Sequence, residues 1–444
     1  MTDQFKQIID LSVKNGRNVF LNGPGGCGKT YTIKELIRHF KLNGIHYAAT
    51  ALTGTAAFNF GGKTIHSFAF GGYGDGKPAD VLRKIPFAKK KIINATKILI
   101  IDEVSMLGAS LLETLNYVFK CVRKSDFPFG GMTLIVSGDF LQLPPVKDAF
   151  AFTSPVWNEL RFVRVDFSTP YRFEDPKYFE MLQRIRIGTP TENDYKRLEY
   201  RRMDIYDILP ENTLIKPTKI YSRRDNVAQE NETELAKIAL PAYTFIAEDS
   251  LMYERRDTLI PIEAMTPAER AEVTAQHGSF KIKDHEVLLN SMSDQTVILK
   301  ETAQAMLNYN VDIETGKING SRCVISKINE SGVYATFLDG ETMLIPQVTI
   351  TRMLPGGLVA CRKQLPLMLG YAITVHKCQG ASLDSAIIDL GKTIFDYSQA
   401  YVALSRVRKL DGLYLTDFAR NSIKSHPAAV AFEVGGAARS PKPP

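Results

Sequence analysis

Residues 23–30 read GPGGCGKT and fit the pattern G-x-x-x-x-G-K-[ST]. The motif follows a short apolar run and precedes an amphipathic stretch, which is the strand–loop–helix order of a phosphate-binding loop. Glycines allow backbone N–H groups to surround phosphate oxygens, and the helix N-terminus adds partial positive charge. The alternative is a glycine-rich turn without a ligand. We expect Lys29 to reach the β- and γ-phosphates and the Thr30 hydroxyl to bind Mg²⁺. The residues assigned to nucleotide binding in this motif are Gly23, Gly25, Gly26, Cys27, Gly28, Lys29 and Thr30.

A second motif supplies acids at the point where an apolar run ends. Residues 97–103 read KILIIDE, so Asp102 and Glu103 close a buried strand and should lie beside the phosphate loop. We expect Asp102 to hold Mg²⁺ and Glu103 to orient and deprotonate the attacking water. The alternative is an ordinary pair of acids at a strand end. Together the two motifs predict hydrolysis of the β–γ bond of a nucleoside triphosphate, but not what the energy is used for.

Short apolar runs alternate with stretches of helical periodicity through the first 170 residues. The runs that are typical of buried parallel strands are 19–21, 47–50, 98–101, 133–136 and 163–167. A second α/β pattern follows, with candidate strands at 219–222, 297–300, 372–375, 386–389 and 413–416. This alternation predicts an α/β fold with mostly parallel sheets.

Three stretches interrupt the α/β pattern. Residues 77–91 carry six basic side chains against one Asp, which predicts a small insertion that projects from the sheet; a solvated charged face is the alternative. Residues 249–284 are polar and poorly periodic, which favours a loop-rich insertion. Residues 320–350 show short alternating runs and glycine-containing turns, which favours a small β-barrel. The end, 435–444, is rich in Gly, Ala and Pro, and we expect it to be disordered.

Composition excludes several classes of protein. The chain has 444 residues, of which 44% are hydrophobic and 23% charged, so global disorder is excluded. A net charge of +7 permits a nucleic-acid partner without establishing one. The cysteines form no C-x-x-C pair, so we expect neither a zinc site nor a disulfide framework. Neither a membrane span nor a secretion signal is recognisable. We expect an intracellular protein, in a bacterial cytoplasm or in the nucleus, mitochondrion or viral replication site of a eukaryotic host.

Further segments follow the phosphate loop in a fixed order. They are 53–57 (TGTAA), 64–68 (TIHSF), 102–106 (DEVSM), 129–131 (FGG), 138–146 (GDFLQLPPV), 171–172 (YR), 376–380 (HKCQG) and 401–406 (YVALSR). In this order they resemble the Pif-type (petite integration frequency) DNA helicases of helicase superfamily 1B, with RecD- and Dda-type helicases as more distant relatives. The resemblance extends from residue 4 to about residue 420.

The resemblance implies an α/β protein with two RecA-like P-loop domains and ATP between them. The first motor domain would span 1–170, with a wedge insertion at about 69–95. The second would span 171–420, with an SH3-like β insertion at about 320–368. Residues 421–444 would form a partly disordered tail.

The resemblance also implies roles at the nucleotide beyond Lys29 and Glu103. Gln142 would contact the γ-phosphate; the alternative is a cap on the turn before two prolines. Arg172 and Arg406 resemble arginines that reach the nucleotide from the second motor domain, where such groups raise rates by roughly 10³–10⁵. The alternative for both residues is an arginine on the protein surface without a role at the nucleotide. Gln4 resembles a glutamine that contacts adenine, although Gln7 lies close by and a solvated position is the alternative.

Several residues lie in segments that contact single-stranded DNA in similar proteins. They are Thr53, Thr55, His66, Ser67, Phe68, His376 and Lys377. Small hydroxyls and backbone N–H groups suit phosphate oxygens. Phe68 would either stack on a base or pack in the core. Both histidines have a buried, hydrogen-bonded position as the alternative.

The resemblance therefore implies an ATP-dependent DNA helicase that moves 5′ to 3′ on single-stranded DNA and unwinds duplexes in replication, repair or recombination. A DNA-stimulated ATPase that translocates with little unwinding is the nearest alternative. A switch, in which ATP controls DNA affinity without motion, is a rival that the complete set of hydrolytic groups disfavours. We expect a monomer that binds single-stranded and forked DNA, with replication or repair proteins as further partners and no membrane.

Overall fold

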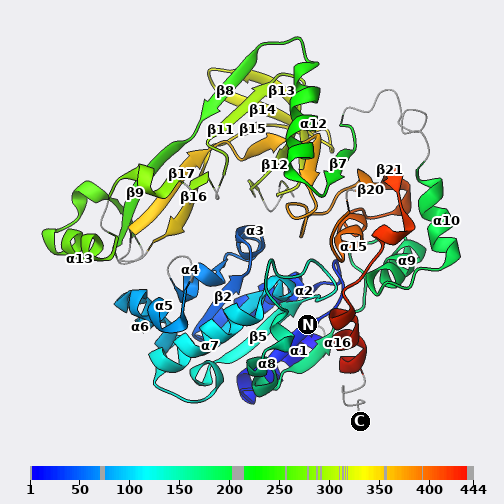
Figure 1. The fold of residues 1–444 in the computed structure, drawn as a ribbon. Coiled ribbons are helices and arrows are strands. Elements are labelled where there is room, and N and C mark those ends of the chain that lie inside the picture. The colour runs from blue at the N-terminus through cyan, green and yellow to red at the C-terminus, as the bar shows by residue number, and fades with distance from the viewer. Residues whose placement is uncertain are drawn as a thin grey trace.

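The computed structural model describes residues 3–437, apart from 71–75, 203–214, 256–257, 278–279, 287–288, 291–292, 310, 313–314, 316, 318, 355–357 and 393. Two α/β units and a β-rich extension make up the molecule (Figure 1). The first unit lies at the bottom of the view, the second at the right, and the extension runs from the top toward the left. Among the described helices, none combines the length and apolar character needed to cross a bilayer.

The described strands of the first unit form one parallel sheet in the order β3-β2-β4-β5-β1-β6. They are β1 (Val19–Asn22), β2 (Tyr47–Ala51), β3 (Lys63–Thr64), β4 (Ile98–Asp102), β5 (Thr133–Gly138) and β6 (Val163–Asp166). Every strand expected in the first 170 residues is present. Strand β4 is buried along its whole length. It ends with Asp102, which therefore lies at the carboxyl edge of the sheet.

Helices cover both faces of this sheet. On one face α2 (Lys29–Leu42) packs through Ile33, Leu36 and Phe40, beside α1 (Asp3–Ile9). On the other face α7 (Ala109–Arg123) packs through Leu112 and Leu115. The remaining helices of the unit are α3 (Gly54–Phe58), α4 (Ile65–Ala69), α5 (Pro78–Lys84), α6 (Phe87–Ala95) and α8 (Pro155–Leu160).

The basic stretch at 77–91 is fixed to the first unit. We expected it to project, but α5 and α6 contact α7, and Val81, Ile85 and Ile93 belong to the core. Lys89 is only 5% exposed, and burial lowers its pKa to about 8. Apolar side chains between the lysines account for the difference, because they bind this stretch to α7. Residues 71–75 of the expected wedge lie outside the described residues.

The second unit has a parallel sheet in the order β19-β7-β20-β21. Its strands are β7 (Thr218–Tyr221), β19 (Ala372–Thr374), β20 (Ala386–Leu390) and β21 (Leu413–Phe418). Its helices are α9 (Pro176–Arg186), α10 (Glu192–Tyr200), α12 (Arg224–Ala236) and α15 (Gln399–Leu404). The mixed α/β class with parallel sheets is thus confirmed.

One expected strand of the second unit lies elsewhere. Residues 297–300 belong to β11 (Thr296–Lys300), which pairs antiparallel with β8 (Ala242–Ile246). Val297 and Leu299 are buried whereas Ile298 is exposed, so this run alternates between two faces. A short apolar run does not reveal which sheet it joins.

The β-rich extension contains two further antiparallel sheets, with strand orders β15-β14-β13-β12-β18 and β10-β9-β17-β16. The first consists of β12 (Gln304–Leu307), β13 (Arg322–Asn329), β14 (Gly332–Phe337), β15 (Thr342–Ile345) and β18 (Leu367–Leu369). The second consists of β9 (Glu248–Arg255), β10 (Thr258–Pro261), β16 (Val348–Met353) and β17 (Leu358–Gln364), with α13 (Pro267–His277) beside it. The stretch 249–284 is therefore not loop-rich, because it includes β9, β10 and α13.

The chain returns to the first unit near its end. Helix α16 (Pro427–Ala437) places Ala429, Val430 and Phe432 against the first unit's core. Glu433 pairs with Arg186 of the second unit at 3.0 Å and with Arg164 of the first at 3.1 Å. Within the stretch from residue 421 that we expected to be partly disordered, α16 connects both units. Residues 438–444 lie outside the described residues.

Candidate functional site

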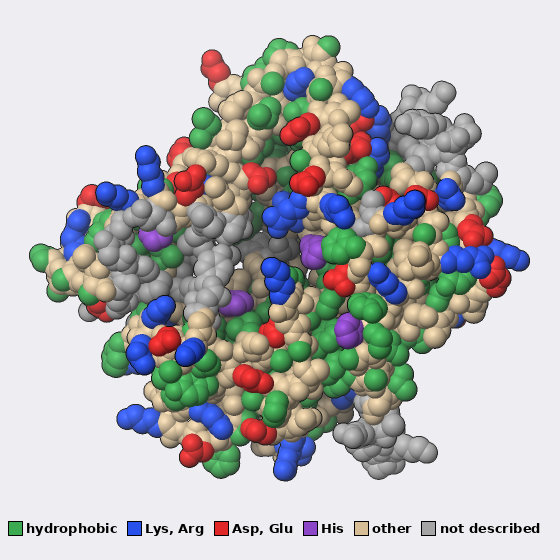
Figure 2. All heavy atoms as spheres, viewed as in Figure 1, with side chains coloured by type: hydrophobic (Ala, Val, Ile, Leu, Met, Phe, Trp, Pro, Cys, Tyr) green, Lys and Arg blue, Asp and Glu red, His purple; other side chains and the backbone are tan. Residues whose placement is uncertain are grey.

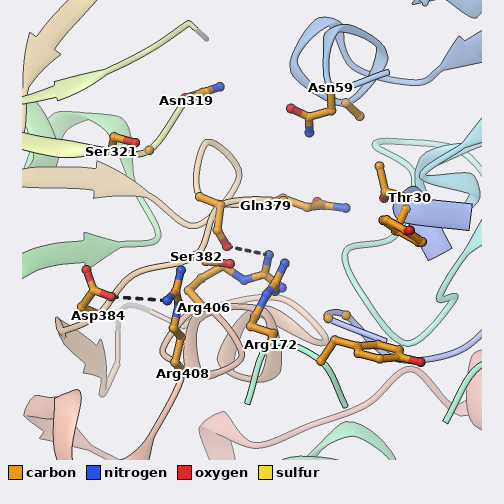
Figure 3. A pocket seen from close by; sticks show the side chains of 18 of the residues that line it. Thr30, Asn59, Arg172, Asn319, Ser321, Gln379, Ser382, Asp384, Arg406 and Arg408 are labelled. Atoms are coloured by element: carbon orange, nitrogen blue, oxygen red, sulfur yellow. Dashed lines mark hydrogen bonds and ion pairs between the residues drawn. The ribbon is translucent and has the colours of Figure 1, made fainter. Parts of the chain in front are cut away.

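A cavity of about 760 Å³ lies where the two α/β units and the β-rich extension meet. Its wall includes the phosphate loop, Asp102 and Glu103 at the end of β4, and side chains of the second unit. Figure 3 shows Arg172 and Arg406 next to each other near Gln379, with Arg408 beside Asp384 and Thr30 on the opposite side. The sequence motifs thus converge in one cavity.

The phosphate loop joins β1 to α2. Gly28 precedes α2 with φ of +86°, a left-handed conformation that glycine adopts without strain. A side chain at Gly23 would meet the Phe167 carbonyl oxygen at 2.1 Å, so only glycine fits there. Lys29 Nζ donates to the carbonyl oxygens of Gly23 at 2.6 Å and Pro24 at 2.9 Å. The Lys29 ammonium is buried inside the loop, where burial lowers its pKa and nearby acids oppose that shift.

Oxygen ligands converge beside this ammonium. The Thr30 hydroxyl lies 3.4 Å from Asp102 Oδ2. Burial, and then the charge of Glu103, raises the pKa of Asp102 to about 6. A hydroxyl next to an anionic carboxylate suits a hard cation such as Mg²⁺, which takes few protein ligands and completes its shell with water and phosphate. No cluster of three or more His, Cys, Asp or Glu occurs in the described part of the chain, so a metal held by protein ligands alone is not indicated.

Glu103 and Gln142 border the same cavity. Glu103 has a left-handed backbone, with φ of +57° and ψ of +45°, which is uncommon for a residue with a side chain and often marks functional sites. Gln142 is 5% exposed, and its Nε2 donates to Asp139 Oδ2 at 3.4 Å. Asp139 is held in turn by Arg186, whose Nη2 lies 2.8 Å from Asp139 Oδ1. This network fixes the Gln142 side chain next to the phosphate loop.

Two guanidinium groups face the phosphate loop from the far side of the cavity. A Cβ at Gly25 would lie 3.4 Å from Arg406 Nη2 and 3.6 Å from Arg172 Nη1. Arg406 is buried and Arg172 is half-buried, and Arg406 is held by a 2.7 Å bond from Nη2 to Ser405 Oγ. Burial, and then the charge of Arg406, lowers the pKa of Arg172 to about 9. In the described chain no carboxylate lies within ion-pair distance of either group, so both are available to an anion.

Two residues at this site received no role from the sequence. Gln379 Nε2 donates to Glu103 Oε2 at 3.0 Å across the cavity. The Tyr171 ring covers Gly28, where a Cβ would lie 3.1 Å from Tyr171 Cε2, and the Tyr171 N–H donates to Gly26 O at 2.9 Å. Both belong to segments quoted above, 376–380 and 171–172, so the segments were found although these two side chains were not assigned.

Gln4 is not among the residues that line the cavity. It lies on α1, where its Nε2 donates to the carbonyl oxygen of Asp166, the last residue of β6, at 2.8 Å. The expected contact with adenine therefore stays a prediction.

The residues expected to contact DNA fall into three groups. His376 and Lys377 are exposed on the turn after β19, and His66 and Ser67 are half-buried on α4. Thr53 caps α3 by accepting the Ala56 N–H at 3.2 Å, and the Thr55 side chain lies outside the described atoms.

The position of Phe68 corrects its assignment to the residues that contact DNA. It is 6% exposed and packs edge-on against Phe119, with ring centroids 6.1 Å apart. The ring therefore belongs to the core and cannot stack on a base in this arrangement. Helical spacing in the short helix α4 points this side chain toward α7.

The fold and the cavity define a P-loop protein whose nucleotide cleft lies between two α/β units. The PIF1-like helicase family matches residues 2–192. ATP-dependent DNA helicase Pif1 of Psychrobacter is 30% identical over 96% of this chain and 69% of its own length. ATP-dependent DNA helicase PIF1 of Xenopus laevis is 34% identical over 96% of this chain, which spans 63% of that relative. The chain belongs to the PIF1-like helicase family.

Solved structures of the family have the same fold. The Pif1 helicase of Candida albicans superposes with a TM-score of 0.77 at 27% identity, covering 98% of this chain and 99% of that one. The Pif1 helicase from Bacteroides in complex with ADP-AlF3 and ssDNA superposes with a TM-score of 0.67 at 25% identity, covering 99% and 97%. The two α/β units are therefore RecA-like domains.

The raised pKa of Asp102 predicts a pH-dependent gain in stability from Asp102→Asn. Folding raises this pKa from 3.8 to about 6, so the charged carboxylate destabilises the fold increasingly as pH rises through this window. Asparagine avoids that cost and can still accept the Glu103 N–H. In EDTA, we expect urea unfolding to give a gain of about 2–3 kcal/mol above about pH 6 and a smaller one near pH 4. An equal gain at both pH values would contradict the burial of a charged Asp102.

Proposed function

We propose that this chain is an ATP-dependent DNA helicase that moves 5′ to 3′ on single-stranded DNA and unwinds duplex DNA in replication, repair or recombination inside the cell. The observation that carries the proposal is the convergence of Arg172 and Arg406 with Glu103 on the phosphate loop. Relatives that are named as ATP-dependent DNA helicases, and a Bacteroides Pif1 structure with ADP-AlF3 and ssDNA, support it. Because one chain supplies both sides of the cleft, a monomer suffices.

Each of the cleft residues has a separate role in the hydrolysis of ATP. Thr30 and Asp102 would hold Mg²⁺, which neutralises charge on the β- and γ-phosphates when bound. Glu103 takes a proton from water as the water oxygen bonds to the γ-phosphorus and the bond to the bridging oxygen of ADP breaks. Lys29, Arg172 and Arg406 stabilise the charge on the transferred group. Gln142 hydrogen-bonds the γ-phosphate and links its loss to Asp139 and Arg186.

DNA would cross the hollow above the first domain. Figure 2 shows a hollow between the first unit and the β-rich extension, with Lys, Arg and His side chains at its border. His376 and Lys377 come from the second domain, and Thr53, His66 and Ser67 from the first, so the two domains grip one strand through its phosphates. Opening and closing of the ATP cleft would then move the DNA-contacting residues of one domain relative to those of the other.

Unwinding of tailed duplexes tests the proposed function. With ATP and Mg²⁺ we expect separation of a duplex with a 5′ single-stranded tail and little separation with a 3′ tail. Glu103→Gln should bind ATP but lose turnover and unwinding, because an amide cannot accept the proton. Turnover that single-stranded DNA does not stimulate would favour the nucleotide-gated switch. Fast DNA-stimulated turnover without strand separation would favour a translocase.

We further propose that helices α5 and α6 separate the strands at the fork. Lys91 is exposed and Lys90 is half-buried at this surface, whereas Lys89 is buried and unsuited to hold DNA. Lys90→Ala with Lys91→Ala should reduce unwinding more than ATP turnover or single-strand binding, because only unwinding needs the fork to be held. The matched control is Lys6→Ala with Lys41→Ala, two exposed lysines on α1 and α2. Equal loss in all three measurements would mean that Lys90 and Lys91 only attract DNA through their charge and do not hold the fork.

A further inference from the structure

Gln379 connects the turn expected to hold DNA with the residue expected to activate water. It follows His376 and Lys377 on the turn after β19, and its Nε2 donates to Glu103 Oε2 at 3.0 Å. Figure 3 shows its side chain extending from this turn toward the side of the cavity where Thr30 and Asn59 lie. Because a carboxylate only accepts, the amide nitrogen must face Glu103. This bond joins the second domain to the first.

The turn that carries Gln379 is fixed to the second domain. Cys378 is fully buried, and its thiol donates to Val375 O at 3.0 Å. The Cys378 N–H donates to Thr374 O at 3.0 Å, and the Lys377 N–H to Thr374 Oγ1 at 3.2 Å. These bonds make residues 374–378 one body with β19. A displacement of Lys377 by DNA would therefore move Gln379 as well.

Glu103, in contrast, has little freedom in its backbone. It is in the left-handed region, and Gly138 packs so closely that an added Cβ would lie 2.8 Å from the Val104 nitrogen. The position of the Glu103 carboxylate is therefore set by its side-chain torsions and by its partners. Gln379 Oε1 is buried without a hydrogen-bond partner in the described chain, so a single bond holds the amide at Glu103. Such a contact is easily broken when the domains shift.

We propose that Gln379 is a positioning residue that restrains Glu103 until DNA moves the turn after β19. The proposal rests on the proposed function, because it assumes that His376 and Lys377 hold DNA and that Glu103 is the base. The bond occupies Oε2 and aims the carboxylate at the second domain. Its release frees Glu103 to accept a proton from water.

Steady-state ATP turnover of the full chain, without DNA and with saturating oligothymidylate, tests this role. Gln379→Ala and Gln379→Leu both remove the donor, and Leu keeps the volume. We expect turnover without DNA to rise about tenfold, the equivalent of about 1.4 kcal/mol, while turnover with DNA stays within about twofold of wild type. The ratio of the two rates should fall accordingly. Gln229→Leu is the control, because Gln229 is an exposed glutamine on α12 of the second domain that does not line the cavity.

The outcomes separate this proposal from the proposed function. If DNA does not change the ATP turnover of the wild type, the proposed helicase function is refuted. If DNA stimulates the wild type and both variants keep the same ratio, the function stands and the role of Gln379 is refuted. Equal loss of turnover in both conditions would refute it too, because damage to the site, rather than release of a restraint, would explain the result. A fall only in the DNA-saturated rate would show that the amide aligns Glu103 and does not restrain it.

Discussion

The cleft depends on two neighbouring guanidinium groups, one buried and one half-buried, neither of which has an acid partner in the described part of the chain. Arg406 is 1% exposed, and Arg172 lies beside it with its pKa lowered by burial and by that neighbour. Burial of like charges is costly unless an anion compensates them. Both groups face the phosphate loop, where the buried ammonium of Lys29 adds a third positive charge. The cleft is therefore built for a polyanion that binds all three at once.

The domains are held in register away from this cleft. Burial alone would raise the pKa of Asp139, but Arg186 holds it below its usual range through charge and hydrogen bonds. Arg186 also pairs with Glu433 of α16, whose apolar face packs on the first domain. Gln142 hydrogen-bonds the same Asp139, so this side chain of the cavity wall is connected to the bonds that join the domains. The cavity wall and the domain alignment are thus linked through one buried carboxylate.

Local patterns made much of the fold and the cleft predictable. The phosphate loop and Asp102 are specified within short segments, because a strand, a glycine-rich loop and a helix follow one another in the chain. Contacts between distant segments were not predictable in this way. Nothing near Gln379 in sequence indicates that it meets Glu103, 276 residues away. Phe68 shows the same limit, since the helix that packs against its ring, α7, is known only from the fold.

The binding preference for triphosphate over diphosphate tests the central role of the arginine pair most directly. Titration calorimetry with a non-hydrolysable ATP analogue and with ADP would compare wild type with Arg406→Met, which removes the charge but keeps the length. Wild type should prefer the triphosphate by at least about tenfold, since a charge-assisted hydrogen bond contributes about 1.5–3 kcal/mol. The variant should lose most of this preference while its affinity for ADP changes little. An unchanged preference in Arg406→Met would contradict the account, because the γ-phosphate would then be recognised without the second domain.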